Sequence, residues 1–150
     1  MNSILSDMPS GLAGAPVPVQ AGLGSVTAGF PSPAADLAAK RIDLNDVLVA
    51  HPAATFMLRV RGASMREAGI DDGDVILVDR ALPARHDQVV VAVIDNGDFT
   101  VKRLHQRRRG GPLKLCAANP TYPDIVPGPE QTVEIWGVVT ACIKFFAKGG

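Results

Sequence analysis

The chain has 150 residues and a mass of 15.7 kDa, which suits one compact domain and leaves little room for a second. Its fifteen basic and fifteen acidic side chains cancel, which excludes a general electrostatic attraction to nucleic acid or to anionic membranes. An apolar content of 47% with a charged content of 20% excludes wholesale disorder.

The first feature in chain order is a stretch without charge, from Met8 to Ala35. Proline or glycine recurs every few residues in it, so no apolar run approaches the roughly 18–20 residues that span a bilayer. The first residues lack the basic start and the continuous apolar segment of a secretory signal. We therefore expect a cytoplasmic protein in which residues 1–33 form a flexible, extended N-terminal arm.

Two short helices are predicted after this arm. The first follows Pro33, over residues 34–37. The second has Asp43 as its N-cap and ends at Pro52. Beyond residue 53 the apolar residues recur with a period of two, which is typical of strands.

The predicted strands are Thr55–Val60, Val75–Val78, Gln88–Ile94, Phe99–Leu104, Leu113–Ala117 and Val133–Phe146, the last one broken at Gly137. The turn residues Asp95–Asn96–Gly97–Asp98 predict a hairpin between the third and the fourth. The sequence thus indicates a mainly β domain with short helices over residues 34–150.

Ser64 is the first candidate catalytic residue. It follows a predicted strand and Gly62, at a point where a short helix can begin. A serine at such a junction can project its hydroxyl, while the first amides of the helix can stabilise an oxyanion. An ordinary serine N-cap is the alternative interpretation.

A serine acts as a nucleophile only if a base can reach it. The histidines His51, His86 and His105 have no local triad context, and we expect them at the surface. Lys102 lies in a predicted strand, on the same face as Thr100 and Leu104. In a partly apolar cleft its pKa falls and the neutral amine can act as a base. A surface lysine is the alternative.

Two charged segments have simpler interpretations. Asp71, Asp72 and Asp74 around Gly73 lack the ligand spacing of a calcium loop, so a tight acidic turn is expected and no metal. The run Arg107–Arg109 is interpreted as a solvated hairpin tip that does not bind DNA directly, since no aromatic residues interleave it. No motif indicates a cofactor.

Three motifs together resemble the LexA/UmuD family of self-cleaving Ser–Lys peptidases, of the S24 type. They are Gly62–Ala63–Ser64–Met65, Gly69–Ile70–Asp71–Asp72–Gly73–Asp74 and Phe99–Thr100–Val101–Lys102. The likeness is closest to the UmuD branch. It begins at Gly29–Phe30–Pro31, ends near Trp136–Gly137, and covers about four-fifths of the chain.

This resemblance implies the β-rich, signal-peptidase-like fold of that family, with Ser64 as nucleophile, Lys102 as general base and a self-cleavage site between Ala28 and Gly29. It also implies a cytoplasmic homodimer that cleaves itself when stimulated by a RecA–single-stranded DNA filament in the SOS response. The shortened form would join a UmuC-type Y-family polymerase for error-prone translesion DNA synthesis.

Three alternatives stay open at this stage. A LexA-type repressor would need a helix-turn-helix, which 33 residues rich in proline and glycine cannot build. A signal-peptidase-like processing enzyme would share the dyad, but a membrane anchor is missing from the sequence. A non-catalytic interaction module of the same fold would have no reason to keep both Ser64 and Lys102.

Overall fold

The computed structural model describes residues 10–11, 18–21, 28–29 and 40–147. Contacts divide the chain into two compact units, Ala13–Ala50 in one and Met1–Leu12 with His51–Gly150 in the other. The boundary expected between residues 33 and 34 lies outside the described residues, and so does the helix predicted at residues 34–37.

The smaller unit contains a two-stranded sheet and one helix. Strand β2 (Pro18–Ala21) pairs antiparallel with β3 (Lys40–Asp43), and helix α1 (Leu44–Leu48) follows directly. The Asp43 carboxylate accepts a hydrogen bond from the Asn45 amide at 2.9 Å, so the predicted N-cap is confirmed. The helix ends at Leu48 and not at Pro52, which instead begins the 3₁₀ helix η1 (Pro52–Ala54) of the larger unit. Proline suits that first helical position, because its fixed φ is already helical.

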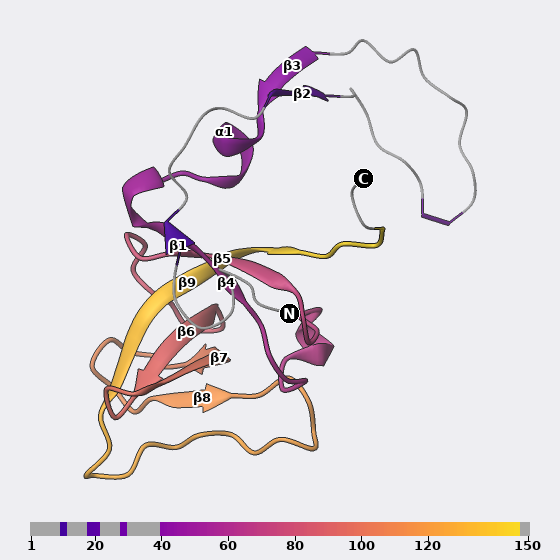
Figure 1. Cartoon of the computed structure of the whole chain (residues 1–150). Helices are drawn as coiled ribbons and strands as arrows, with labels where there is room; N and C mark the ends of the chain where they lie inside the picture. Colours follow the sequence, from indigo (N-terminus) through magenta and orange to yellow (C-terminus); the bar gives the residue numbers. More distant parts are fainter. Residues whose placement is uncertain (1–9, 12–17, 22–27, 30–39, 148–150) are drawn as a thin grey trace. The chain divides into compact units, whose positions relative to one another are not determined.

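The larger unit is a seven-stranded antiparallel sheet in the order β1-β4-β5-β9-β6-β7-β8 (Figure 1). Its strands are β1 (Ser10–Gly11), β4 (Thr55–Arg59), β5 (Val75–Asp79), β6 (Val89–Ile94), β7 (Asp98–His105), β8 (Lys114–Cys116) and β9 (Val133–Ile143). The predicted mainly β class is confirmed, and all six strands predicted beyond residue 53 are present. Strand β1, which pairs with the outer edge of β4, was not predicted.

Strand β9 is continuous through Gly137, so the predicted break is wrong. The strand pairs with β5 on one side and β6 on the other, and its register shifts once against each neighbour. A Cβ atom added at Gly137 would lie only 2.6 Å from Cγ1 of Val78. The glycine therefore marks an irregular part of the sheet where two strands approach closely, and it does not end the strand.

The hairpin between β6 and β7 forms as predicted. The Gly97 amide donates to the Ile94 carbonyl at 3.0 Å, and the two central residues Asp95 and Asn96 have φ of 50° and 58°. Positive φ at both central positions is the requirement of a type I′ turn, whose twist matches the paired strands. This turn fixes the register that directs the Lys102 side chain.

Two apolar clusters lie on opposite sides of the sheet, because successive side chains of a strand point to opposite faces. Val90 and Val91 of β6 are neighbours in the chain but belong to different clusters. Met65 and Ile70 pack into the same cluster as Val91, and Met65 is 2% exposed. The segment that carries Ser64 is thereby anchored on the core.

Of the helices in the described part of the chain, none combines the length and apolar character that crossing a bilayer requires.

Candidate active site

Ser64 lies in the connection between β4 and the 3₁₀ helix η2 (Arg66–Ala68). Gly62 begins the turn with φ of 92°, a conformation that favours glycine. The residue that caps η2 is Met65, and no side chain provides a capping hydrogen bond. The N-cap interpretation of Ser64 is therefore wrong, and its hydroxyl is directed elsewhere.

The Ser64 hydroxyl lies beside the amine of Lys102, which comes from β7. Lys102 Nζ donates to Ser64 Oγ at 2.9 Å, to Thr100 Oγ1 at 2.9 Å and to the Val101 carbonyl at 3.1 Å. Lys102 is 8% exposed, so it is not a surface lysine. Within the described ranges no carboxylate forms an ion pair with it, and burial lowers the pKa of Lys102 below its ordinary value.

Both side chains open into a cleft of about 380 Å³. Its walls come from the end of β4, the turn before η2, and β7, with Ile76 and Val91 contributing from β5 and β6. The lining mixes apolar side chains with polar and charged ones, among them Arg59, Arg61 and Asp98.

The remaining lining residues are Leu58, Val60, Gly62, Met65, Gly97, Phe99, Thr100 and Val101.

The segment that follows β8 forms hydrogen bonds to the backbone around Ser64. Asn119 Nδ2 donates to the Ala63 carbonyl at 2.8 Å, and the Ala118 amide donates to the Ser64 carbonyl at 2.8 Å. The amides of Ser64 and Met65 find no acceptor among the described residues. Sequence reasoning missed Asn119, because its only local signal, an asparagine before a proline, indicates no more than a turn.

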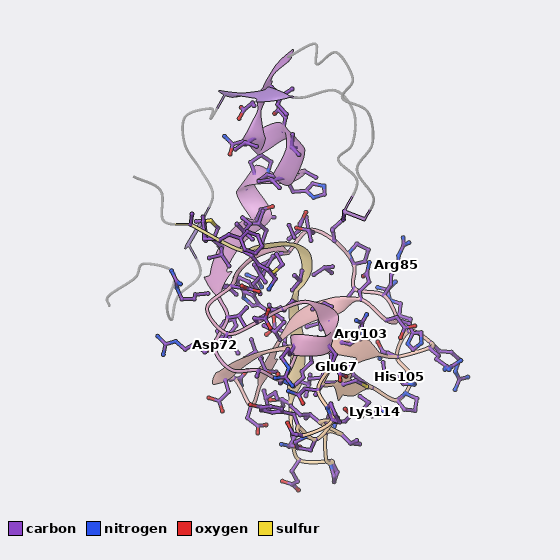
Figure 2. All side chains as sticks on the ribbon, turned by 90° about the vertical axis from the view of Figure 1, so that its right-hand side faces the viewer. Glu67, Asp72, Arg85, Arg103, His105 and Lys114 are labelled. Atoms are coloured by element: carbon purple, nitrogen blue, oxygen red, sulfur yellow. The ribbon has the colours of Figure 1, made fainter. Side chains whose placement is uncertain are left out.

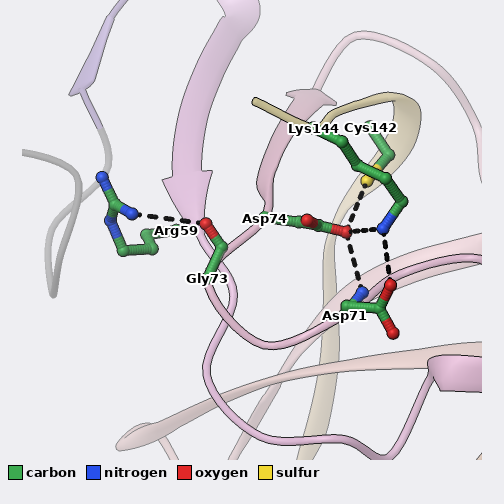
Figure 3. A network of polar contacts seen from close by, with 6 residues as sticks. All are labelled: Arg59, Asp71, Gly73, Asp74, Cys142 and Lys144. Carbon is green, nitrogen blue, oxygen red and sulfur yellow. Dashed lines mark hydrogen bonds and ion pairs between the residues drawn. The ribbon is translucent and has the colours of Figure 1, made fainter. Parts of the chain in front are cut away.

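The acidic turn at residues 71–74 binds the backbone that precedes Ser64. Gly73 lies in this turn with φ of 88°. The Asp72 carboxylate accepts the Gly62 amide at 2.6 Å. Figure 3 shows Asp74 accepting bonds from the Asp71 amide, Cys142 and Lys144. The interpretation as a tight acidic turn is therefore confirmed.

The pKa values in this turn follow from the same contacts. Burial raises the pKa of Asp74, but the hydrogen bonds from Lys144, the Asp71 amide and Cys142 outweigh it and hold the pKa below its usual value. The same bonds to Asp71 and Asp74 raise the pKa of Lys144.

The three histidines lie outside the cleft lining. His51 Nδ1 is 2.6 Å from the buried carboxylate of Asp79. His51 is exposed, as predicted, whereas His86 and His105 are half-buried, with their rings 4.6 Å apart. Figure 2 labels Arg85, Arg103 and His105 on this part of the sheet, where the exposed run Arg107–Arg109 forms the turn after β7.

His86, Asp87 and His105 bring three ligand-type atoms within 4.8 Å of one another. The Gln106 amide donates to His86 Nδ1 at 3.1 Å, which leaves the proton of a neutral ring on Nε2, facing Asp87. A metal ion on Nε2 needs that nitrogen without its proton. The arrangement therefore suits a hydrogen bond to Asp87 better than a metal ion.

Ala28 and Gly29, the expected cleavage site, are exposed and belong to Ala13–Ala50, not to the unit that carries Ser64 and Lys102. A Cβ added at Gly29 would meet nothing within 4 Å.

Comparison with known proteins identifies the family of this chain. The model of the Peptidase S24-like family matches residues 20–140. Protein MucA of Escherichia coli is 46% identical over 115 residues, which are 77% of each chain, and protein ImpA of Shigella flexneri is 46% identical over 116 residues with the same coverage. The LexA repressor of Azoarcus is 45% identical over 124 residues, which are 81% of this chain but 59% of the repressor. The chain belongs to the Peptidase S24-like family, and the resemblance drawn from its motifs is confirmed.

Proposed function

We propose that this chain is a self-cleaving serine peptidase of the SOS response. Ser64 is the nucleophile, Lys102 is the general base, and the bond between Ala28 and Gly29 is cut. The observation that carries the proposal is the 2.9 Å contact between Lys102 Nζ and Ser64 Oγ, made by a buried lysine inside a cleft. Without a carboxylate partner, burial favours the neutral amine that a base requires.

The reaction follows the chemistry of acyl transfer. Neutral Lys102 takes the Ser64 proton as Oγ attacks the Ala28 carbonyl, and the amides of Ser64 and Met65 stabilise the resulting oxyanion. Lys102 then gives the proton to the Gly29 nitrogen as the peptide bond breaks. Water, deprotonated by the same lysine, hydrolyses the acyl-enzyme and frees Ser64.

The cleavage site suits this cleft. Ala28 and Gly29 are small, so the backbone can approach the serine closely. Gly29 precedes Ser64 by only 35 residues, and such a tether gives a high effective concentration for attack within one chain or across a dimer.

The proposal extends to partners. A homodimer is cleaved when a RecA–single-stranded DNA filament stimulates it, and the product from Gly29 to Gly150 joins a UmuC-type Y-family polymerase for translesion synthesis in the cytoplasm. Membership of the family and the similarity to MucA and ImpA support this branch. A LexA-type repressor is less well supported, since the match covers 77% of MucA but 59% of that repressor.

Mass spectrometry of the purified protein, incubated with a RecA–single-stranded DNA filament, tests the proposal. A fragment that begins at Gly29 is expected. Ser64→Ala and Lys102→Ala should each abolish it while the fold is kept, since neither side chain belongs to the two apolar clusters. Cleavage of Ser64→Ala at the wild-type rate would contradict the assignment, and an intact wild-type chain would contradict the self-cleavage itself.

A further inference from the structure

The backbone of residues 63–67 is hydrogen-bonded to one short segment, residues 118–119, which does not line the cleft. Ala118 accepts a bond from the Glu67 amide and donates one to the Ser64 carbonyl, both at 2.8 Å. Asn119 adds a third bond, from its side chain to the Ala63 carbonyl at 2.8 Å. Asn119 is the one side chain among these bonds, and it is 6% exposed.

The orientation of the Asn119 amide is fixed by its other partner. Its Oδ1 accepts from both the backbone amide and the hydroxyl of Thr121, at 3.1 Å and 2.9 Å. Two donors identify this atom as the oxygen, so the nitrogen must face the Ala63 carbonyl. Rotating the amide would place oxygen against oxygen and leave buried groups unpaired.

Planar trans peptides transmit this constraint to the amides of the cleft. The described chain has no cis peptide bond, and in a trans peptide the carbonyl and the next N–H point in opposite directions. Because Asn119 binds the Ala63 carbonyl, the Ser64 N–H points away from Asn119. Because Ala118 binds the Ser64 carbonyl, the Met65 N–H points away from Ala118. Ser64 and Met65 line the cleft, whereas Ala118 and Asn119 do not.

We propose that Asn119 is a positioning residue for catalysis, which orients the Ser64 amide toward the oxyanion by holding the Ala63 carbonyl. This inference rests on the proposed role of Ser64 as nucleophile. It assigns to Asn119 no contact with the substrate and no proton transfer. A donor set in place before the reaction stabilises the transition state without reorganisation, and its misplacement is costly.

Asn119→Asp is the sharpest test, because it keeps the oxygen that Thr121 binds and replaces the donor that faces Ala63 with a charged oxygen, while Asn119→Ala removes the same donor without adding a charge. Thr121→Val is the matched control, since it removes a bond to Asn119 Oδ1 and leaves the bond to Ala63. We expect Asn119→Asp to lower the plateau rate of self-cleavage at alkaline pH about 100-fold. The pH midpoint set by Lys102 should stay in place in Asn119→Ala, which adds no charge near the lysine. Thr121→Val should remain within about threefold of wild type.

Binding of phenylboronic acid gives a readout that does not need cleavage. Ser64 Oγ bonds to boron, its proton passes to Lys102, and the tetrahedral anion requires the same amides. Asn119→Asp should weaken this binding and Thr121→Val should not. If Asn119→Asp does not fold, as judged by its thermal unfolding, Asn119→Ala replaces it with the same expectations.

Wild-type rates and boronate affinity in the Asn119 variants would overturn this inference and leave the proposed function standing. A shifted pH midpoint with an unchanged plateau in Asn119→Ala would also overturn it, because Asn119 would then act on Lys102. A wild-type chain that neither cleaves itself nor binds the boronate would overturn the proposed function together with the inference.

Discussion

In the part of the chain that the structure describes, Lys102 is held by hydroxyl and carbonyl oxygens and by no carboxylate. Its amine contacts Ser64 Oγ, Thr100 Oγ1 and the Val101 carbonyl, three neutral groups that do not compensate for the loss of water around a charge. In its neutral form the amine can donate to Thr100 and Val101 and accept the Ser64 proton with its lone pair. A buried carboxylate at the same place would have kept the lysine protonated. The same environment that buries Lys102 therefore also prepares it to accept a proton.

Self-cleavage without any activator should accelerate as the pH rises. Burial lowers the pKa of Lys102 from its ordinary value of about 10.4, so the neutral amine appears at a lower pH than for a solvated lysine, and the rate should level off above the lowered pKa. The measurement is the rate of appearance of the Gly29 fragment across a pH series, with Lys102→Ala as the inactive control.

A histidine base would give a different profile. Its reference pKa of about 6.5 would bring the rate to a plateau above about pH 7.5. A profile that levels off near neutrality, or a rate that survives in Lys102→Ala, would show that Lys102 is not the base.

At the scale of the element, β9 shows how a glycine can belong to a strand. It lies between β5 and β6, and its register shifts against both. Near these shifts, Gly137 lies close to the side chain of Val78, which is fully buried. The strand therefore requires glycine at position 137, because a side chain there would overlap with Val78.

Gly137→Val should destabilise the protein by about 1–3 kcal/mol, the range for overfilling a packed core. The added Cβ would lie 2.6 Å from Val78 Cγ1 and 3.3 Å from the Asp79 carbonyl, and the latter belongs to the backbone and cannot move aside. Urea denaturation measures the change. Gly128→Ala is the control, because its Cβ would meet only Gln131 Oε1 at 3.9 Å, and an equal loss there would refute the explanation.

The elements beyond residue 53 were predictable because each strand has an apolar period of two and is bounded by turn residues. Strand β1 was not, since Ser10–Gly11 has no apolar pattern and pairs only because β4 offers an edge. Ser64 and Lys102 were predictable as candidates, but their contact depends on a register that joins residues 38 positions apart. Asn119 lies 56 positions from Ala63, and only the folded chain shows what it binds.

At the scale of the molecule, the last strand supports the segment before the nucleophile. Lys144, just after β9, binds Asp71 and Asp74 in the acidic turn. In the same turn the Gly73 amide donates to the Val60 carbonyl, and the Asp72 carboxylate accepts a bond from the Gly62 amide. Lys144 is thus connected, through this one turn, to the segment that precedes Ser64.

Lys144→Met should lower the melting temperature at neutral pH more than Lys114→Met does, because the one ion pair of Lys114 among the described residues is with Asp124, at 3.5 Å and near the surface. The pKa of Asp74 is lowered in the folded chain, so its contribution to stability is present above about pH 3.9 and is lost as the pH falls through the folded pKa. The difference between the two variants should therefore shrink in acid. Thermal unfolding at pH 7 and below pH 3 measures it, and a difference that persists in acid would contradict this account.

Two of the described pairings join strands from opposite sides of the proposed cut. Strands β1 and β2 precede Ala28, whereas their partners β4 and β3 follow Gly29. Loss of residues 1–28 would turn the outer edges of β3 and β4 into rows of unpaired N–H and C=O groups, which are templates for adding a strand from another chain. Cleavage of one peptide bond would thus expose two strand edges that can pair with another chain, although every side chain of the product stays the same.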